Sequence, residues 1–476
     1  MDIKRENDFL LRIKKEGDMR LDALVFANRE LKMEESALLQ LANAACLPSA
    51  EYVLGMPDIH HGYGVPIGSV VATREIIIPA AVGYDVNCGM RLMLTSLSAG
   101  EVDVNPLADG IKRSVPLGEG KKNVPFKRDD FVSVMEGGLS ALVELSPSGH
   151  RVWEGFDPAE EKANQERVED RGSMEGSIDA VPENAIERGL NQLGTMGGGN
   201  HFIELQKVEE VLDKKAASRF GIFKGQFTIM VHSGSRAFGH DVGGHYMKMA
   251  KSFNKEHGSS VPGLSYFPLT SRESKNYIHA MHAAANFAFV NRALMAALVR
   301  DEFKKRYSEQ RVWQLYDVPH NMAKLELHHG NQLWVHRKGS TRAFDARHMK
   351  GTPFADVGQP VLIPGSMGTS SYVLLGVPSG EKSLYSVNHG AGRLMSRSEA
   401  SGGRKGKKKK SGQAAISDSR FRESMEGVYL LCDNKSAAKE EAPDAYKDID
   451  AVVRTVEDAG LARPVARMVP CAVLKG

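Results

Sequence analysis

Cysteine is scarce in this sequence, and its few copies are widely separated. Cys46, Cys88, Cys432 and Cys471 are spread over 476 residues. None of them has the CxxC spacing of a zinc or redox site, and the pattern does not describe a disulfide framework. This cysteine usage favours a reducing compartment.

Long apolar runs are also lacking. The first twenty residues are charged throughout and lack the apolar stretch of about 7–15 residues that a signal peptide needs. No segment approaches the ~18 consecutive apolar residues of a membrane span. We therefore expect a protein with no membrane association that works in the cytoplasm, or in the nucleus if the host has one.

Charge of one sign is not in excess either. The chain has 62 Lys and Arg against 59 Asp and Glu, a formal net charge of +3, which excludes a histone-like polycation. Hydrophobic residues make up 42% of the chain and the mean hydropathy is −0.32, values typical of a folded protein with a large core. The length allows about three domains of ~150 residues or one large mixed unit.

The order of helical and extended patterns predicts an α+β fold. Apolar spacing over residues 22–50 predicts a helical N-terminal segment, and residues 51–100 change to Gly-rich turns around short β-branched runs, typical of sheet. Thr270 and Glu273 form a capping box before an Ala-rich run that predicts a long helix ending near Tyr307. Strands and helices do not alternate as βαβ units, which argues against a doubly wound sheet.

Two segments lack a packing pattern. Residues 151–188 are rich in Glu and Asp and poor in large apolar side chains, so we interpret them as a solvated excursion without chemistry. Residues 402–412, GGRKGKKKKSG, are too rich in Gly and Lys to pack and are predicted to form a loop. This loop carries six positive charges in the seven positions 404–410.

Several short segments place His, Cys, Asp or Asn among glycines, where the backbone can turn sharply and approach a ligand closely. A single His beside Gly is most often an ordinary loop or core histidine, but so many in one chain indicate a shared site. The segments are residues 56–64, 82–91, 193–204, 230–240, 317–321 and 387–397.

Five side chains from these segments are candidate metal ligands. Together they supply one carboxylate, one thiolate and three imidazoles, enough for two metal ions if the thiolate bridges. The mixed set suits Mn²⁺, Fe²⁺, Co²⁺ or Zn²⁺, so ligand types alone do not name the metal. The alternative for the cysteine is a buried small hydrophobic residue. The five are Asp85, Cys88, His201, His232 and His320.

HGAGR (389–393) and PGSMGTSSY (364–372) are candidate phosphate cradles, because small residues expose backbone N–H groups and Arg393 adds a forked donor. The sequence has no Walker A motif and no KxDG-type ligase lysine, so nucleotide chemistry would need another nucleophile. His389 is the candidate, since a neutral imidazole can attack phosphorus and hold a phosphoramidate. The alternative is a histidine that makes one structural hydrogen bond.

Ten segments resemble the RtcB family of RNA-splicing ligases, in the family's order from about residue 50 to residue 476. They are PDIHHGYGVPIG, VGYDVNCGMR, LGTMGGGNHFIE, MVHSGSRAFGH, DVPHN, HRKGSTRAF, QPVLIPGSMGTSSYVL, HGAGR, EAPDAYKDID and LKG. The resemblance implies one large, mixed α+β domain over residues 1–476, with central β-sheets flanked by helices. It also implies a ligase that uses GTP and two Mn²⁺ ions per active site.

The RNA that the resemblance implies has a 3′-phosphate or 2′,3′-cyclic phosphate end, which is joined to a 5′-hydroxyl end in tRNA splicing or RNA repair. An archease-type activator is the partner protein that the family suggests. Two alternatives stay open: a metal-dependent RNA phosphoesterase, and an RNA-binding protein without catalysis. His389 with HGAGR and Lys475 favours the ligase, because hydrolysis would not need them.

The resemblance also implies individual roles. His389 would carry the guanylate, with Asp58 close to the reacting centre and Arg393 near the RNA phosphate. Asp85, Cys88 and His201 would hold one manganese ion, and Cys88, His232 and His320 the other. Glu204 would accept from guanine, and Tyr446 would stack on it. The guanylate site would comprise Asn200, His201, Phe202, Ile203, Glu204, His320, Asn321, Pro364, Gly365, Ser366, Met367, Ser371, His389, Gly390, Ala391, Gly392, Tyr446 and Lys475.

The basic loop at 402–412 departs from the family pattern, because it interrupts the region after Arg393. A solvated loop is the ordinary interpretation of such a run. Our hypothesis is that it adds contacts to the RNA backbone. A smaller departure is Gly198, where family members often carry Ser, and we expect it to have little effect.

Overall fold

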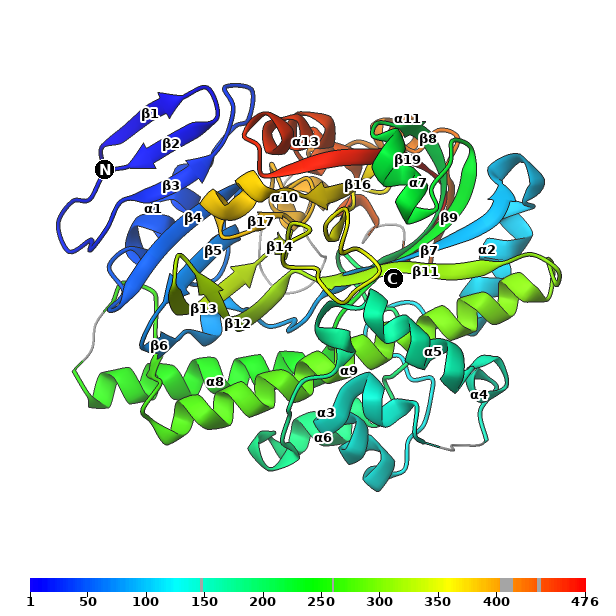
Figure 1. Ribbon diagram of the computed structural model, residues 1–476, viewed down its shortest axis with the longest axis horizontal. Helices are drawn as coiled ribbons and strands as arrows, with labels where there is room; N and C mark the ends of the chain where they lie inside the picture. The colour runs from blue at the N-terminus through cyan, green and yellow to red at the C-terminus, as the bar shows by residue number, and fades with distance from the viewer. Residues whose placement is uncertain (146–148, 259–260, 403–413, 435–437) are drawn as a thin grey trace.

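The protein, described by a computed structural model, is built around two large, mostly antiparallel sheets (Figure 1). The structure describes residues 1–476 except 146–148, 259–260, 403–413 and 435–437. The first sheet has the strand order β1-β2-β3-β4-β5-β13-β12. Its strands are β1 (Ile3–Asn7), β2 (Leu10–Ile13), β3 (Ala23–Phe26), β4 (Ala50–His60), β5 (Ile67–Thr73), β13 (Asn331–Lys338) and β12 (Asn321–His328).

The second sheet has the order β11-β7-β9-β8-β19-β16-β15, and β18 pairs in parallel with β19. Alternate residues of its strands enter two different apolar cores, so both faces are covered. Its strands are β11 (Val312–Pro319), β7 (Gly89–Ser98), β9 (Gln226–Ser233), β8 (Phe202–Val211), β19 (Ala462–Lys475), β16 (Ser371–Gly376), β15 (Pro360–Ile363) and β18 (Tyr429–Cys432). Two short ladders join β14 (Ser340–Arg342) to β17 (Ser386–Asn388) and β6 (Ile76–Ile77) to β10 (Phe267–Pro268).

The long helix α9 (Arg272–Lys304) packs below the second sheet beside α8 (Arg236–Glu256), as Figure 1 shows. Every residue from 283 to 300 is buried, because α3 (Arg128–Leu142) and α2 (Val104–Ser114) cover its other sides. The other helices are α1 (Glu35–Ala44), α4 (Val152–Gly155), α5 (Pro158–Asn164), α6 (Glu183–Gly189), α7 (Lys214–Phe220), α10 (Arg397–Ser401), α11 (Asp418–Ser424) and α13 (Ile449–Asp458).

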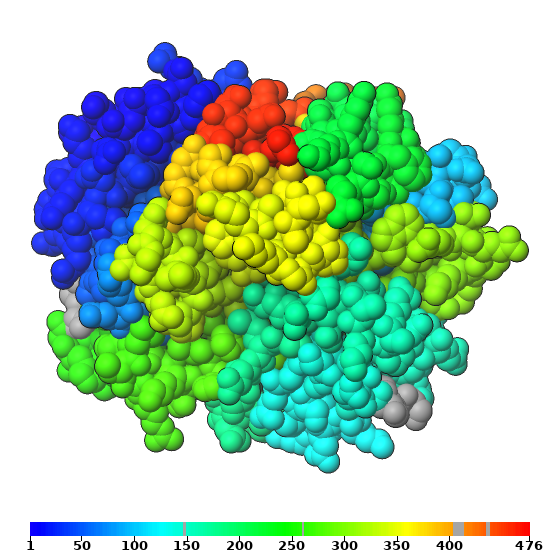
Figure 2. All heavy atoms as spheres, in the orientation of Figure 1, coloured from blue at the N-terminus to red at the C-terminus, as the bar shows by residue number. Residues whose placement is uncertain are grey.

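The helix α13, near the C-terminus, packs against the N-terminal strands. Figure 2 shows the red C-terminal segment, which includes α13, against the blue N-terminal strands. Ile449 and Val453 of α13 share an apolar core with Phe26 of β3 and Leu54 of β4. The N-terminal strands are therefore an integral part of the packed structure.

The α+β class is confirmed, since only β3–β4 and β18–β19 pair in parallel within the described residues. The helical N-terminal segment, predicted over residues 1–50 from the apolar spacing at 22–50, is wrong in its first half. Residues 3–26 hold β1, β2 and β3, and helix forms only at α1. Pairing of β3 with β2 and β4 outweighs the weak helical spacing.

The capping box predicted at Thr270 and Glu273 does not form, and the helix instead has a single N-cap one residue later. The cap is Ser271, whose hydroxyl oxygen accepts from the Ser274 N–H at 3.1 Å. The predicted long helix itself is present, ending at Lys304. The basic loop predicted at 402–412 lies outside the described residues, apart from Gly402.

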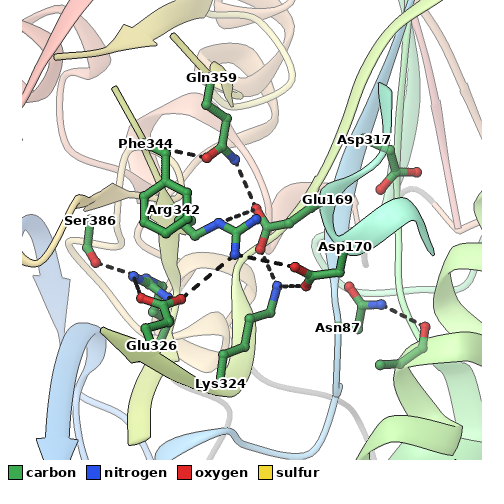
Figure 3. A network of polar contacts seen from close by, with 12 residues as sticks. Asn87, Glu169, Asp170, Asp317, Lys324, Glu326, Arg342, Phe344, Gln359 and Ser386 are labelled. Atoms are coloured by element: carbon green, nitrogen blue, oxygen red, sulfur yellow. Dashed lines mark hydrogen bonds and ion pairs between the residues drawn. The ribbon is translucent and has the colours of Figure 1, made fainter. Parts of the chain in front are cut away.

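A buried charge network joins the first sheet to the segment after α5. Figure 3 shows Lys324 of β12 between Glu169 and Asp170, and Arg342 of β14 beside the same two carboxylates. The Arg342 guanidinium keeps its charge, because burial lowers its pKa less than Glu169 and Asp170 raise it. The network fixes the acidic excursion against the sheet, so part of it is buried rather than solvated.

A second buried network lies under the edge of the second sheet. Arg292 of α9 donates from Nη2 to Asp317 Oδ1 at 2.8 Å and from Nη1 to the carbonyls of Asn87 at 2.7 Å and Ser233 at 2.9 Å. Asp317 also accepts from Arg91 Nε at 2.8 Å. These charged side chains are fully buried, so their attraction acts with little screening by water.

Asp317→Asn should lower the free energy of unfolding by about 3–5 kcal/mol, because it leaves buried guanidinium charge uncompensated. The measurement is urea unfolding followed by tryptophan fluorescence. The control is Asp356→Asn, which breaks the exposed Arg219–Asp356 pair and should cost less than about 1 kcal/mol. Equal losses in the two variants would contradict the importance given to burial.

Candidate functional site

The candidate metal ligands meet at one edge of the second sheet. Cys88 precedes β7, His201 precedes β8, His232 lies near the end of β9, and His320 follows β11. These strands are neighbours in the order β11-β7-β9-β8 and pair antiparallel. The start of one strand therefore lies beside the end of the next, and segments far apart in sequence come together.

The ligand atoms form two groups that share the thiol. Cys88 Sγ lies 3.3 Å from His201 Nε2 and 3.2 Å from His232 Nε2. His201 Nε2 lies 2.8 Å from Asp85 Oδ2, and His232 Nε2 lies 3.3 Å from His320 Nε2. Within each group, Asp85–Cys88–His201 and Cys88–His232–His320, all ligand atoms lie within 4.8 Å of one another.

Burial disfavours the charged forms of the side chains in this cluster. It lowers the pKa of His232 and His320 well below the usual value, so both imidazoles are neutral and offer lone pairs. Burial and the Asp85 carboxylate raise the pKa of the Cys88 thiol. Burial also raises the pKa of Asp85, but the nearby His201 lowers it further and keeps the carboxylate charged.

The donor set fits divalent cations. Neutral imidazoles, a carboxylate and a thiol converge in a buried space, and a cation would compensate the charge of the thiolate. His201 is oriented from behind, since its Nδ1 lies 3.0 Å from the Met196 carbonyl, the second contact that metal-binding histidines usually make. The residues present could therefore hold two cations with Cys88 between them.

His389 lies next to this cluster, with its ring centroid 5.0 Å from that of His320. Its Nδ1 is 2.6 Å from Oδ2 of the buried Asp58, which also accepts from the His389 backbone N–H at 3.1 Å. The carboxylate thus holds the ring from one side and leaves Nε2 available. Gly392 permits this approach, because a Cβ there would lie 2.1 Å from the Asp58 carbonyl oxygen.

A cavity of about 220 Å³ opens beside His389. It brings together most of the residues predicted to bind the guanylate, from β8, the 364–367 loop, the 389–393 turn and the C-terminus. Those that line it are Asn200, Phe202, Pro364, Gly365, Ser366, Met367, His389, Gly390, Ala391, Gly392, Tyr446 and Lys475, and Arg393, predicted near the RNA phosphate, lines it too.

Six predicted residues do not line the cavity. His201 and His320 belong to the metal cluster, Glu204 lies behind the wall, and Ile203, Asn321 and Ser371 make other contacts. Ile203 points to the opposite face of β8 and packs in the core with Val231. Asn321 donates to the Asp85 carbonyl at 3.1 Å and accepts from the Gly339 N–H at 2.8 Å, so it holds two loops together. Ser371 donates to Glu204 Oε1 at 3.3 Å.

Glu204 is buried behind the cavity wall, next to Phe202 on the same face of β8. Its Oε1 accepts from Gln206 Nε2 at 2.6 Å, besides the bond from Ser371. Burial raises the pKa of Glu204 to about 8. Burial also lowers the pKa of Lys475, which lies near the Phe202 ring, to about 8.

The guanidinium of Arg393 donates its hydrogen bonds to groups of the protein itself. It donates from Nη1 to Tyr446 Oη at 3.0 Å and to Glu441 Oε2 at 3.3 Å, and from Nη2 to the Glu440 carbonyl at 2.6 Å. Its guanidinium also lies over the Tyr446 ring, 4.9 Å from the centroid. In this arrangement Arg393 fixes Tyr446 at the wall of the cavity.

A second cleft of about 490 Å³ adjoins the metal cluster at Asp85 and His201, and sequence analysis missed its cations. Arg188, Arg236 and Arg397 line it. Arg188 falls in the acidic excursion to which no chemistry was assigned. Arg236 has a left-handed backbone with φ +54°, a strained position for a non-glycine residue and one that the sequence does not show.

Comparison with known proteins agrees with the family resemblance. A family model described as tRNA-splicing ligase RtcB matches residues 40–476. The tRNA-splicing ligase RtcB of Thermococcus kodakarensis is 40% identical, covering 96% of this chain and 95% of the relative. That of Aeropyrum pernix is 39% identical over 96% of each chain. The RNA-splicing ligase RtcB of Mycobacterium bovis is 37% identical, covering 92% and 100%.

The shared thiol gives a test of the cluster. Cys88→Ser should weaken the binding of Mn²⁺ at least ~10-fold, because both ligand groups lose their common donor. Binding is measured by calorimetry and by metal content after gel filtration. Cys471→Ser, a change of a half-buried thiol outside the cluster, is the control and should bind as the unmodified protein does. Full metal binding by Cys88→Ser would contradict a shared site.

No helix among the described residues has both the length and the apolar character that crossing a membrane requires.

Proposed function

Because this chain belongs to the RtcB family and is an RNA ligase, a family whose named members act in tRNA splicing, we propose that it seals RNA through a guanylylated His389. It would join a 3′-phosphate or 2′,3′-cyclic phosphate end to a 5′-hydroxyl end with GTP. The observation that carries the proposal is the geometry of His389, which is held at Nδ1 by Asp58 beside the metal cluster and the cavity.

In the first step, His389 Nε2 attacks the α-phosphorus of GTP. An N–P bond forms, the bond between the α-phosphorus and its bridging oxygen breaks, and pyrophosphate leaves. Asp58 keeps the ring in one orientation and stabilises positive charge as Nδ1–H persists through the attack. The glycines of the 389–393 turn leave room for phosphate oxygens close to the backbone.

In the second step, an oxygen of the RNA 3′-phosphate attacks the guanylate phosphorus and the N–P bond breaks, which frees His389. In the third, the 5′-hydroxyl oxygen attacks the RNA 3′-phosphate, GMP leaves, and the hydroxyl proton is lost. A 2′,3′-cyclic end would first be opened by water. We assign the RNA 3′-phosphate to the cleft of Arg188, Arg236 and Arg397, because guanidinium groups suit phosphate and the cleft adjoins the cluster.

Two Mn²⁺ ions fit the donor set in this proposal, one held by Asp85, Cys88 and His201 and one by Cys88, His232 and His320. When bound, they would neutralise phosphate charge and orient the reacting groups. The cavity residues supply the remaining positioning, which dominates phosphoryl transfer.

Glu204 is proposed to select guanine. Its carboxylate can accept from guanine N1–H and N2–H₂, a pair of donors that adenine lacks, and its free Oε2 is oriented by the bonds that Oε1 accepts. Tyr446, fixed by Arg393, would stack on the base. Lys475 would contribute a cation near the nucleotide phosphates.

Cytoplasmic action and an archease-type activator complete the proposal. Cys46, Cys88 and Cys471 are free thiols, as a reducing compartment would keep them. The activator is supported only by the family.

The guanylylation step has a direct test. With α-labelled GTP and Mn²⁺, the protein should acquire label that survives alkali and is lost in acid, the stability pattern of a phosphoramidate. His389→Ala should acquire none, because the nucleophile is gone, whereas His348→Ala, which changes a histidine outside the site, should label fully. Labelling of His389→Ala at the normal level would refute the assignment of the nucleophile.

GTP binding should depend on pH through Glu204. With a pKa of about 8 in the empty cavity, the carboxyl is protonated below pH 8 and must release its proton to accept from guanine. Affinity should therefore rise by at most about tenfold per unit as the pH approaches 8, and fall above it as Lys475, whose pKa is also about 8, loses its charge. Calorimetry of GTP binding to the His389→Ala protein in buffers of different ionisation enthalpy measures the proton released.

Glu204→Gln should remove this proton release and weaken GTP binding, while Glu210→Gln, an exposed change on the same strand, should keep both. A release that persists in Glu204→Gln would assign the titration to another group.

A further inference from the structure

Few aromatic side chains are exposed on this protein, and two of them are neighbours. Among the described residues, the exposed Tyr, Phe and Trp side chains are Tyr63, Tyr84 and Phe223, with exposed fractions of 57%, 38% and 40%. Tyr63 and Tyr84 lie 5.9 Å apart between ring centroids. Tyr84 stacks in turn on the exposed His240, at 4.8 Å and an interplanar angle of 19°. The three rings form a continuous row, named here the aromatic row.

The aromatic row begins at the candidate active site. His240 lines the arginine cleft together with Asp85, and Tyr84 is the residue before that candidate metal ligand. At the other end, Tyr63 follows the segment that holds Asp58. The row therefore leads from the cleft, where we place the RNA 3′-phosphate, to the outside of the molecule.

The row is held rigidly. The backbone of Gly83 and Tyr84 packs directly on α8, since a Cβ at Gly243 would lie 2.9 Å from the Gly83 carbonyl oxygen. Lys338 donates to the carbonyls of Tyr63, Val65 and Ala80 and so ties down the loop that carries Tyr63. A preorganised surface loses little entropy when it binds a ligand.

One face of α8 continues from the aromatic row and carries three lysines. His240, Gly244, Lys248, Lys251 and Lys255 follow one face of α8 at intervals of three or four residues. Lys251 and Lys255 line a hollow of about 440 Å³ with Tyr63, and no acidic residue lines it. Within the described part of the chain, none of these three lysines has a salt-bridge partner, so their charges are available to an anionic ligand.

We propose that the aromatic row and the α8 lysines bind an unpaired stretch of RNA next to the ligation junction. Bases would stack on Tyr63 and Tyr84, while backbone phosphates would meet Lys251 and Lys255. Stacking rings beside a basic track are the features that proteins use to bind single strands without reading their sequence. The assignment rests on the proposed RNA ligase chemistry and adds a preference for unpaired nucleotides at the junction.

The test uses the full-length protein with Mn²⁺ and short labelled RNAs, and measures binding by fluorescence anisotropy. One RNA ends in a 3′-phosphate and the other begins with a 5′-hydroxyl. Tyr63→Ala and Tyr84→Ala should each weaken binding of one RNA about 5- to 150-fold, the range for loss of one stacked base. The RNA that is affected identifies the strand that follows the row. Tyr84→Phe should retain affinity, because the ring remains.

Joint replacement of Lys251 and Lys255 by Gln should reduce the salt dependence of binding. Loss of two phosphate contacts on a single strand lowers the slope of log K against log salt by about 1.4. The matched control replaces the exposed Lys214 and Lys215 of α7, and Phe223→Ala is the control for the tyrosines. A slope change as large in the α7 control would show a general charge effect and overturn the assignment.

Labelling with GTP separates this inference from the proposed function. The row variants should label at His389 as the unmodified protein does, since that step needs no RNA. Unchanged affinity of both RNAs in the tyrosine variants would overturn the inference and leave the surface to a protein partner. Loss of labelling in the unmodified protein would instead refute the ligase chemistry, whatever the RNA affinities.

Discussion

The site depends on one buried ion pair, between Arg292 in the middle of α9 and Asp317 on β11. Arg292 also donates to the carbonyls of Asn87 and Ser233, the residues next to Cys88 and His232. Asp317 lies on β11, three residues before His320, which follows the strand. One guanidinium thus links the backbone beside three candidate ligands, and its fixed fork of donors resists rearrangement. The helix that carries it is buried on all sides, which makes the anchor rigid.

Such an anchor is needed because the cluster is unfavourable without cations. Three imidazole nitrogens, a thiol and a carboxylate lie within a few ångströms in a buried space, where polar groups are costly unless they are paired. The sheet has to hold them against this cost. Asn87, with a left-handed φ of 55°, belongs to the tight turn between Asp85 and Cys88, and its carbonyl is the one that Arg292 binds. The buried charge of Arg292 therefore stabilises a turn whose backbone is strained at Asn87.

The sequence predicts the reactive and metal-binding residues of this site better than the residues that line its cavity and cleft. The ligands and His389 stand out because six Gly-containing segments with His, Cys, Asp or Asn occur in one chain, and the long helix is clear from its Ala-rich run. The direction of Ile203 could not be predicted, because it depends on which face of β8 meets the cavity. The strand β3 was missed since its pairing with β4 involves residues thirty positions away. Arg188 was missed because it lies in an acidic segment of the sequence, and only the fold places its side chain at the cleft.

In the proposed mechanism, the positions of the cavity and the arginine cleft let one small metal cluster serve three phosphoryl transfers. The cavity meets it at His232, beside His389, and the arginine cleft meets it at Asp85 and His201. Nucleotide and RNA would therefore approach from different sides and need no exchange of places. The guanylate phosphorus would pass from His389 to the RNA 3′-phosphate, and the RNA phosphorus would then pass from GMP to the 5′-hydroxyl oxygen. Transfers of this kind are governed by alignment and local charge. The fold must therefore keep the sheet edge rigid, which the Arg292–Asp317 pair does. The loops that carry the other site residues extend from this edge.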